Sequence, residues 1–482
     1  MSTNDTVNKK NSIYLILNLK FAIITVIMSD SSKAIINDMT QGSVFKKMVV
    51  FSLPVMISNA LQLCYGLIDM VIVGKFVGSA GLSAITIGSQ VFNLMATLCI
   101  GFSVGGQVFI SQLIGGKEYK RLNQTIGTVF TLVGFLGLLM TLIGFCFSVP
   151  VLRLMNTPEE SFEMAKSYMK VCSGGVLFTY GYNMVSAILR GMGDSKRPLL
   201  FILISTIVNL AGDLLLVGYF KMGAAGAAWA TILGQAVSFV IALVFLVRRK
   251  EEFHFDFKAR SFIPENSTAV KLVKLGVPFA LQNSSIDISM MFVCALVNSF
   301  GVIASATFGV GSRLQSLGFV MSGAVGAFVS SLVGQNIAAG KMDRVHKGIH
   351  LGLVSSIIFW GILTSVFLIF PDMCFGLFSK DQEVLNMAPL YMMCMAVGAP
   401  ALACMTPYNG FIQGIGNSKM SLIFSILDGF VARISLSYLI GIVAGLGLKG
   451  FFLGYFLAPY FTTIPAMIYY YSGIWKKRKL LA

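Results

Sequence analysis

Charged residues are scarce in this chain: Asp, Glu, Lys and Arg make up 12% of its 482 residues, about half their share in a typical soluble protein. The deficit extends along the whole length, and 56% of the residues are hydrophobic. This composition excludes a soluble domain with a single membrane anchor. Because a helix needs about 20 apolar residues to cross the hydrocarbon core, the apolar runs predict an all-α membrane protein. We expect twelve transmembrane helices, at residues 47–74, 80–112, 124–149, 164–189, 198–219, 224–247, 270–298, 303–335, 347–371, 387–412, 420–441 and 447–472.

Acidic residues are scarcer than basic ones, 20 against 36, which gives a net charge of +16. Such an excess can indicate nucleic-acid binding, but its placement favours another explanation. With a cytoplasmic N-terminus, 27 of the 36 Lys and Arg residues fall in inner segments and seven in outer ones, while Arg313 and Arg433 lie within spans. The positive-inside rule therefore predicts that both termini are cytoplasmic. We expect a multi-pass monomer of the plasma (cytoplasmic) membrane whose basic charge serves topology and membrane lipid, without nucleic acid.

Motifs of enzymes and ATP-driven pumps are also missing. The sequence has no HExxH or P-loop pattern, and its three histidines lie in predicted cytoplasmic segments or at a helix edge. Its eight cysteines form no CxxC pair and lie almost all within spans, which is typical of small core residues. No repeated filter loop of a channel is present either. We therefore expect no catalytic residues and no cofactor, and any transport by this chain would use an ion gradient.

An internal repeat relates the two halves of the sequence at an offset of 223 to 224 residues. The segment 52-SLPVMI-57 matches 276-GVPFAL-281, which aligns Pro54 with Pro278, and 190-RGMGDSK-196 matches 413-QGIGNSK-419. Each copy contains six predicted helices, an even number, so both copies face the same way and are related by a pseudo-two-fold axis along the membrane normal. Two such bundles, joined by a cytoplasmic linker, indicate a transporter that exposes its substrate to alternate sides.

The repeat divides the chain into two lobes with flanking segments. We predict an N-terminal cytoplasmic extension at 1–40, an N-lobe at 41–247, a cytoplasmic linker at 248–269, a C-lobe at 270–475 and a basic cytoplasmic tail at 476–482. The stretch 13-IYLILNLKFAIITVIM-28 is short, contains Lys20 and lacks a small-residue cleavage site, so it is a poor signal peptide. It is either an interfacial helix or an upstream extension with Met28 as the natural start, and we favour the extension.

Four polar residues of the N-lobe are predicted to lie at one depth in the outer half of the membrane. Asp69 comes six residues before Lys75 in the first span, and Asp213 comes eight residues before Lys221 in the fifth. Asn209, four residues before Asp213, shares its helix face, and Thr231 follows Lys221 by ten residues in the sixth span.

A buried carboxylate is costly in a membrane, so this cluster could hold a proton or Na⁺, a hard cation that oxygen ligands suit. The alternative is that these groups only join three helices by hydrogen bonds. The repeat argues against packing alone, because it places Phe292 or Val293 opposite Asp69 and Leu436 or Ser437 opposite Asp213.

The predicted spans contain other polar groups whose roles the sequence leaves open. The charges of the C-lobe either neutralise one another in its core or contact substrate; they are Asp287, Arg313, Asp428 and Arg433. We expect a substrate cavity lined by polar groups of the first, seventh and eighth spans; the candidates are Asn59, Gln62, Tyr65, Gln282, Asn283, Asp287 and Arg313.

The chain resembles the MATE (multidrug and toxic compound extrusion) family over about residues 37–475. The resemblance is carried by 37-NDMTQGS-43, 66-GLIDMVIVGKFVG-78, 189-LRGMGDSKRP-198 and 209-NLAGD-213. It implies an exporter of organic cations driven by entering H⁺ or Na⁺, with the coupling ion at Asp69, Asn209, Asp213 and Thr231.

The C-lobe departs from the pattern of some branches of that family. Ile286 and Leu402 stand where those branches place a glutamate and an aspartate. The departure shifts the expected ion site to the N-lobe. The rival hypothesis is a related flippase that exports a lipid-linked saccharide or another amphipathic metabolite.

Overall fold

The computed structural model describes residues 35–155, 157–478 and 480, and almost all of them are helical. The predicted stretch 13–28 and the proposed start at Met28 lie outside the described residues. Among the described residues, eleven helical segments are long and apolar enough to cross a membrane. The twelfth span is α4, Glu159–Gly191, which has the necessary length but carries many Ser, Tyr and Gly side chains. The prediction of twelve transmembrane helices is therefore confirmed.

The N-lobe begins with α2, Val44–Gly115, which contains the first two spans. At Gly78 the backbone turns to φ 81° and ψ −168°, a conformation that glycine adopts readily and that separates a span at 44–78 from one at 83–115. The lobe continues with α3 Tyr119–Leu154, α4, α5 Lys196–Asp213, the π-helix η1 Leu214–Tyr219 and α6 Gly223–Arg248. The linker contains the short α7, Lys250–Phe253, and the 3-10 helix η2, Ala259–Phe262.

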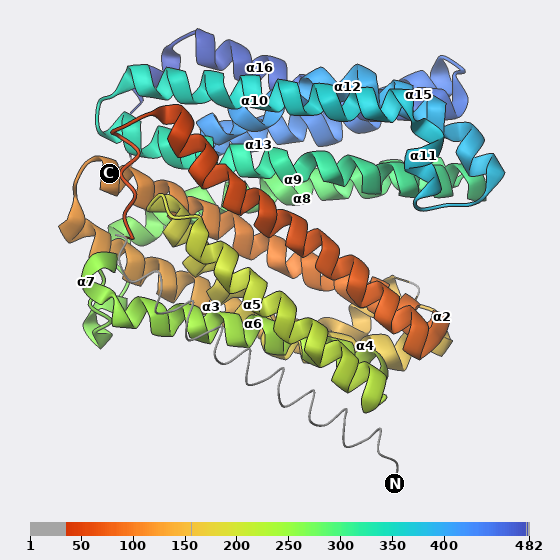
Figure 1. Cartoon of the computed structure of the whole chain (residues 1–482), viewed down its shortest axis with the longest axis horizontal. Helices are drawn as coiled ribbons and strands as arrows, with labels where there is room; N and C mark the ends of the chain where they lie inside the picture. Colours follow the sequence, from red (N-terminus) through yellow and green to blue (C-terminus); the bar gives the residue numbers. More distant parts are fainter. Residues whose placement is uncertain (1–34, 156, 479, 481–482) are drawn as a thin grey trace.

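The C-lobe repeats this order with more interruptions. It contains α8 Asn266–Asn298, α9 Val302–Ala338, α10 Met342–Ile369, α11 Pro371–Gly376, α12 Gln382–Gly414, α13 Ser418–Ile426, η3 Leu427–Ile434, α14 Ser435–Tyr438, η4 Leu439–Val443, α15 Gly447–Leu457, α16 Tyr460–Tyr471 and η5 Ile474–Lys477. The segments α13 to η4 form one membrane span, and α15 with α16 forms the last. Figure 1 shows the two lobes side by side, with α8 to α16 above and α2 to α6 below.

The internal repeat is also visible in the backbone conformation. Left-handed φ angles recur in five pairs of turns at offsets of 223 or 224; the pairs are Gly78 and Gly301, Lys117 and Gly340, Gly193 and Gly416, Lys221 and Gly445, and Gly223 and Gly447. The offset rises from 223 to 224 within the fifth span of each lobe. One added residue in a helix produces a π-bulge, and the C-lobe has an additional π segment there, η3. The last π segments, η1 and η4, occupy matching positions in the two lobes.

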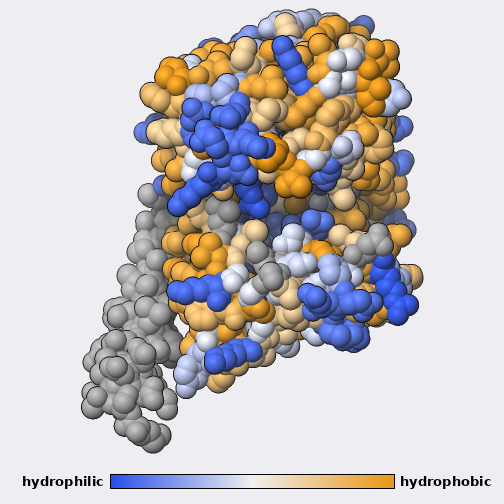
Figure 2. All heavy atoms as spheres, turned by 90° about the vertical axis from the view of Figure 1, so that its right-hand side faces the viewer, coloured by the Kyte–Doolittle hydropathy of each residue, from blue (hydrophilic) through white to orange (hydrophobic). Residues whose placement is uncertain are grey.

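The lobes meet at one end of the molecule, which we call the closed end. There Gln107 donates to Ser331 Oγ at 3.0 Å, and Gln335 donates to the carbonyl of Gly191 at 3.1 Å. The start of α2 also packs on the C-lobe, where Phe51 lies against Phe328. At the opposite end the lobes diverge, and Figure 2, which looks onto that end, shows a recess with hydrophilic atoms between the two halves.

Candidate functional site

The structure brings the two acids of the N-lobe together. Asp69 lies in the first span of α2, nine residues before the kink at Gly78, and Asp213 is the last residue of α5, directly before the π-helix η1. Their side chains are 8% and 0% exposed, and the two carboxyl groups are near enough for the charge of Asp69 to act on Asp213. The two acids, which the sequence predicted to lie at one depth in the membrane, therefore belong to helices that pack against each other, α2 and α5.

Close packing of α5 on α6 positions Asn209. Asn209 is 2% exposed and lies one turn before Asp213. On the facing helix, a β-carbon at Gly234 would lie 2.7 Å from the carbonyl oxygen of Ser205 and 3.2 Å from Cβ of Asn209. The missing side chain at Gly234 thus lets α6 approach α5 at the level of the amide.

Thr231 joins the cluster through Tyr65. Tyr65 lies one turn before Asp69 on α2, and its hydroxyl donates to Thr231 Oγ1 at 2.9 Å. The sequence placed Tyr65 among the residues of the substrate cavity and missed this bond. The spacing of four between Tyr65 and Asp69, which puts both on one helix face, was the available signal.

Several polar atoms of this cluster have no protein partner. Four buried atoms form no hydrogen bond among the described residues. They are Asp69 Oδ1, both carboxyl oxygens of Asp213 and the side-chain amide nitrogen of Asn209. None of the ion pairs formed by those residues includes either acid. Burial of an ion without a partner costs on the order of several kcal/mol of desolvation free energy. The cluster therefore gathers buried oxygen atoms without a basic partner among the described residues, a set of donors that suits a proton or a hard cation.

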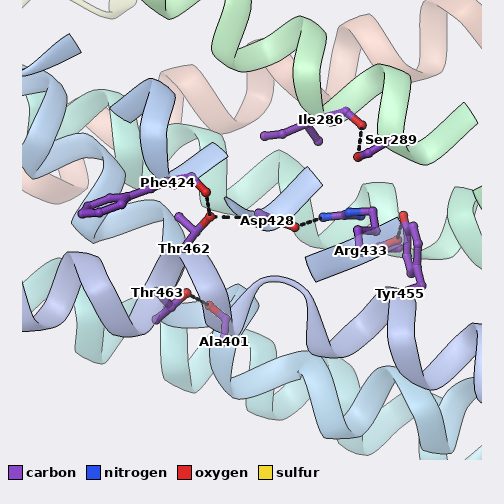
Figure 3. A network of polar contacts seen from close by, with 10 residues as sticks. Ile286, Ser289, Ala401, Phe424, Asp428, Arg433, Tyr455, Thr462 and Thr463 are labelled. Atoms are coloured by element: carbon purple, nitrogen blue, oxygen red, sulfur yellow. Dashed lines mark hydrogen bonds and ion pairs between the residues drawn. The ribbon is translucent and has the colours of Figure 1, made fainter. Parts of the chain in front are cut away.

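The C-lobe neutralises its buried acid with a basic side chain (Figure 3). Arg433 Nη2 lies 2.8 Å from Asp428 Oδ1, and the two side chains are 6% and 1% exposed. Thr462 lies 3.5 Å from the other Asp428 oxygen, and the Arg433 guanidinium stacks over the ring of Tyr455 at 4.8 Å. The hypothesis of mutually neutralising charges is thus confirmed for Asp428 and Arg433.

That hypothesis is wrong for the other two charges of the C-lobe. Asp287 and Arg313 are both exposed and form no ion pair among the described residues. Arg313 reaches the N-lobe instead, where its Nη2 lies 4.0 Å from Sδ of Met70. Arg313 therefore lies between the lobes, beside the residue that follows Asp69.

The remaining candidates for the cavity occupy different surroundings. Asn59 donates to the carbonyl of Val320 across the lobes at 3.1 Å, and Gln62 is exposed. Asn283 is partly buried, whereas Gln282 is buried and accepts a hydrogen bond from Ser421 within the C-lobe. Their roles toward substrate stay predictions.

Known proteins share both the sequence and this architecture. A model of the MatE family matches residues 54–215 and again 278–439, the two halves of the repeat. The probable multidrug resistance protein YpnP of Bacillus subtilis (strain 168) is 31% identical over 443 residues, covering 92% of this chain and 98% of the relative. The multidrug export protein MepA of Staphylococcus aureus (strain MSSA476) is 24% identical, covering 89% of this chain and 94% of the relative.

Solved structures agree on the fold. A MATE crystal structure in complex with MaL6 has a TM-score of 0.86 at 22% identity and covers 93% of this chain and all of that one. A MOP superfamily transporter from Pyrococcus furiosus has a TM-score of 0.85 at 22% identity, with the same coverage. The fold is thus that of a two-lobed, multi-pass membrane transporter. The chain belongs to the MatE family of multidrug efflux transporters, which confirms the resemblance found in the sequence.

Proposed function

We propose that this protein is a secondary active multidrug exporter that moves small organic cations out of the cell against entering H⁺ or Na⁺. The observation that carries the proposal is the buried pair Asp69 and Asp213, which lacks any neutralising partner among the described residues. The export of drugs is supported by the names of the relatives, several of which are multidrug resistance or export proteins. A family of transporters gives no reason to expect catalytic residues or a cofactor.

The coupling ion would bind inside the N-lobe, at Asp69, Asn209, Asp213 and Thr231. Without it, two carboxyl groups share a buried site; with it, their charge is reduced and α2, α5 and α6 can close around the site. One charge that moves through about 100 mV supplies about 2.3 kcal/mol. Such a difference is enough to shift a two-state equilibrium between lobe arrangements by more than tenfold.

The orientation of the molecule follows from the charge distribution of the sequence. The closed end carries the basic loops that we assign to the cytoplasm, and the recess faces the opposite side. With both termini in the cytoplasm of a plasma-membrane protein, the structure corresponds to an outward-open state. An organic cation would leave through the recess, past Asp287 and Arg313, while the coupling ion reaches Asp69 and Asp213 from the same side.

The alternative function is a flippase for a lipid-linked saccharide or another amphipathic metabolite. The observation that favours it is Arg313, an exposed cation between the lobes that would suit an anionic headgroup. A single such cation is weak support for a pyrophosphate site, so we retain the multidrug exporter as the main proposal.

Accumulation of a fluorescent organic cation in cells that lack their own efflux pumps tests the proposal. Cells with the wild-type protein should stay dim, and cells with Asp69→Asn should accumulate dye as cells without the transporter do. The matched control is Asp372→Asn, an exposed aspartate in the first turn of α11, which should leave export unchanged. A protonophore, or removal of sodium, then identifies the ion.

Three outcomes would contradict parts of the proposal. Equal export by wild type and Asp69→Asn at matched expression would show that Asp69 is structural. A wild-type protein that never lowers the dye content would contradict multidrug export and favour the flippase. Loss of export in Asp372→Asn as well would mean that the assay reports folding rather than coupling.

A further inference from the structure

A second cavity lies at the closed end, on the seam between the lobes, and the proposed exporter does not use it. It has a volume of about 570 Å³ and is formed by the residues at the start of α2 and one face of α10. Figure 1 shows the start of α2, in red, beside the beginning of α10. Anything that fills this groove therefore touches elements of both lobes.

The groove is basic at one end and apolar at the other. Arg344, Lys347 and Leu351 follow one another on α10 at spacings of three and four, so they share a helix face with Val354 one turn further on. The cations lie in the first two turns of α10, which begins at Met342, and the apolar side chains lie deeper in the span. Phe45, 59% exposed, extends the apolar part from α2.

Among the described residues that line this groove, none is acidic. Arg344 is held by the chain before α2, since its guanidinium donates to the carbonyls of Met39, Gln41 and Gly42 at 2.8, 3.1 and 2.7 Å. Lys347 is exposed at the groove and takes part in no ion pair among the described residues. The groove thus presents an available positive charge next to a partly exposed apolar surface at the level where a span begins.

We propose that the groove binds an anionic glycerophospholipid, with the phosphate at Lys347 and an acyl chain along Phe45, Leu351 and Val354. A phosphate that bears an apolar chain matches both the charge and its position relative to the membrane, because a lipid headgroup lies where the helix begins and its chain extends inward. The bound lipid contacts α2 and α10 at once. It therefore stabilises the arrangement in which the closed end is shut, and it favours that state of the transport cycle.

Lipid binding to the purified, full-length protein tests this site without any transport assay, so its failure is distinguishable from failure of the proposed exporter. Native mass spectrometry and thermal unfolding would compare phosphatidylglycerol with phosphatidylcholine of the same chains. We expect preferential binding of phosphatidylglycerol and a higher unfolding midpoint with it. One cation near a lipid surface contributes about fivefold in affinity, so Lys347→Gln should weaken binding about fivefold and Lys347→Arg should keep it.

Matched controls separate this groove from general attraction to basic protein. Lys419→Gln removes an exposed charge near the start of α13, outside the groove, and should bind phosphatidylglycerol as wild type does. Val354→Trp, which fills the apolar part, should also reduce binding.

Four results would overturn the proposal. Equal binding of the two lipids, or equal losses in Lys347→Gln and Lys419→Gln, would mean that no specific site exists. Binding that Val354→Trp leaves unchanged would exclude the assigned acyl-chain position. Protection by inorganic phosphate equal to that by phosphatidylglycerol would identify a site for free phosphate rather than for lipid.

Discussion

The two lobes share one backbone plan but treat buried charge in opposite ways. In the N-lobe, Asp69 and Asp213 lie together with no neutralising side chain among the described residues, whereas in the C-lobe Asp428 is paired with Arg433 at 2.8 Å. Asp287, which also lies in a C-lobe span and forms no ion pair among the described residues, is exposed rather than buried. Duplication of a helix bundle therefore does not require duplication of its electrostatics.

The repeat shows which C-lobe residues stand at the positions of the N-lobe cluster. At the offset of 224, Arg433 occupies the place of Asn209, and Tyr455 occupies the place of Thr231. The C-lobe thus holds a permanent guanidinium where we propose that the N-lobe binds an exchangeable ion. The π segment η3 carries both Asp428 and Arg433, so the added residue of the C-lobe helix lies where its fixed ion pair forms.

The largest effect that would separate the two lobes is on stability, through Asp428→Asn. This change leaves the Arg433 guanidinium buried without its partner, which costs about 3–5 kcal/mol. Thermal unfolding of the purified protein should show a much lower midpoint, and the double variant Asp428→Asn with Arg433→Gln should recover part of the loss. An unfolding midpoint equal to that of wild type would show that the pair is not a structural element.

Asp213→Asn should have the opposite effect: it should abolish export but leave the stability of the fold nearly unchanged. Because Asp213 is an acid without a partner, its neutralisation removes a cost, so the unfolding free energy should change by less than about 1 kcal/mol or rise. Export should fall to background and no longer respond to the ion gradient. Parallel unfolding and dye-export measurements check this, and a strongly destabilised but still coupled Asp213→Asn would reverse our assignment of roles.

Packing behind the proposed ion site can be compared across the lobes at Gly234 and Ala458, which are related by the offset of 224. Gly234→Ala places a β-carbon 2.7 Å from a carbonyl oxygen, and such overpacking costs about 1–3 kcal/mol. Ala458→Gly should cost about 1 kcal/mol or less. Unfolding midpoints check the stability, and export at varied ion concentration should reveal weaker ion binding in Gly234→Ala alone. Similar export in both variants would show that the approach of α6 to α5 does not shape the site.

The smallest effect concerns Tyr65 and Ser289, which an offset of 224 places at corresponding positions of the two lobes. Tyr65→Phe removes the hydrogen bond to Thr231, worth about 1 kcal/mol, so about fivefold more coupling ion should be needed for half-maximal export. Ser289 donates to Ile286 within its own helix, and Ser289→Ala should leave that concentration unchanged. Export measured against ion concentration distinguishes the two, and an equal shift in both variants would argue against a specific role for Tyr65.

The class of the fold could be predicted from the sequence. Apolar runs of about 20 residues must form helices in lipid, because the backbone polar groups there can be paired only within the segment. The sequence repeat predicted two related helix bundles. Because membrane helices lie nearly parallel to one another, counting residues from the loops was enough to place Asp69 and Asp213 at one depth, and in the structure the charge of Asp69 acts on Asp213.

The neighbours of each side chain could be learned only from the packing of the helices. Position along a helix gives depth, but rotation about its axis and the approach of the next helix set the contacts. Thus Tyr65 turned toward Thr231, Gln282 turned into the C-lobe, and Arg313 extended toward Met70 instead of pairing with Asp287. The groove beside Lys347 joins segments about 300 residues apart, and no local pattern in the sequence encodes such a meeting.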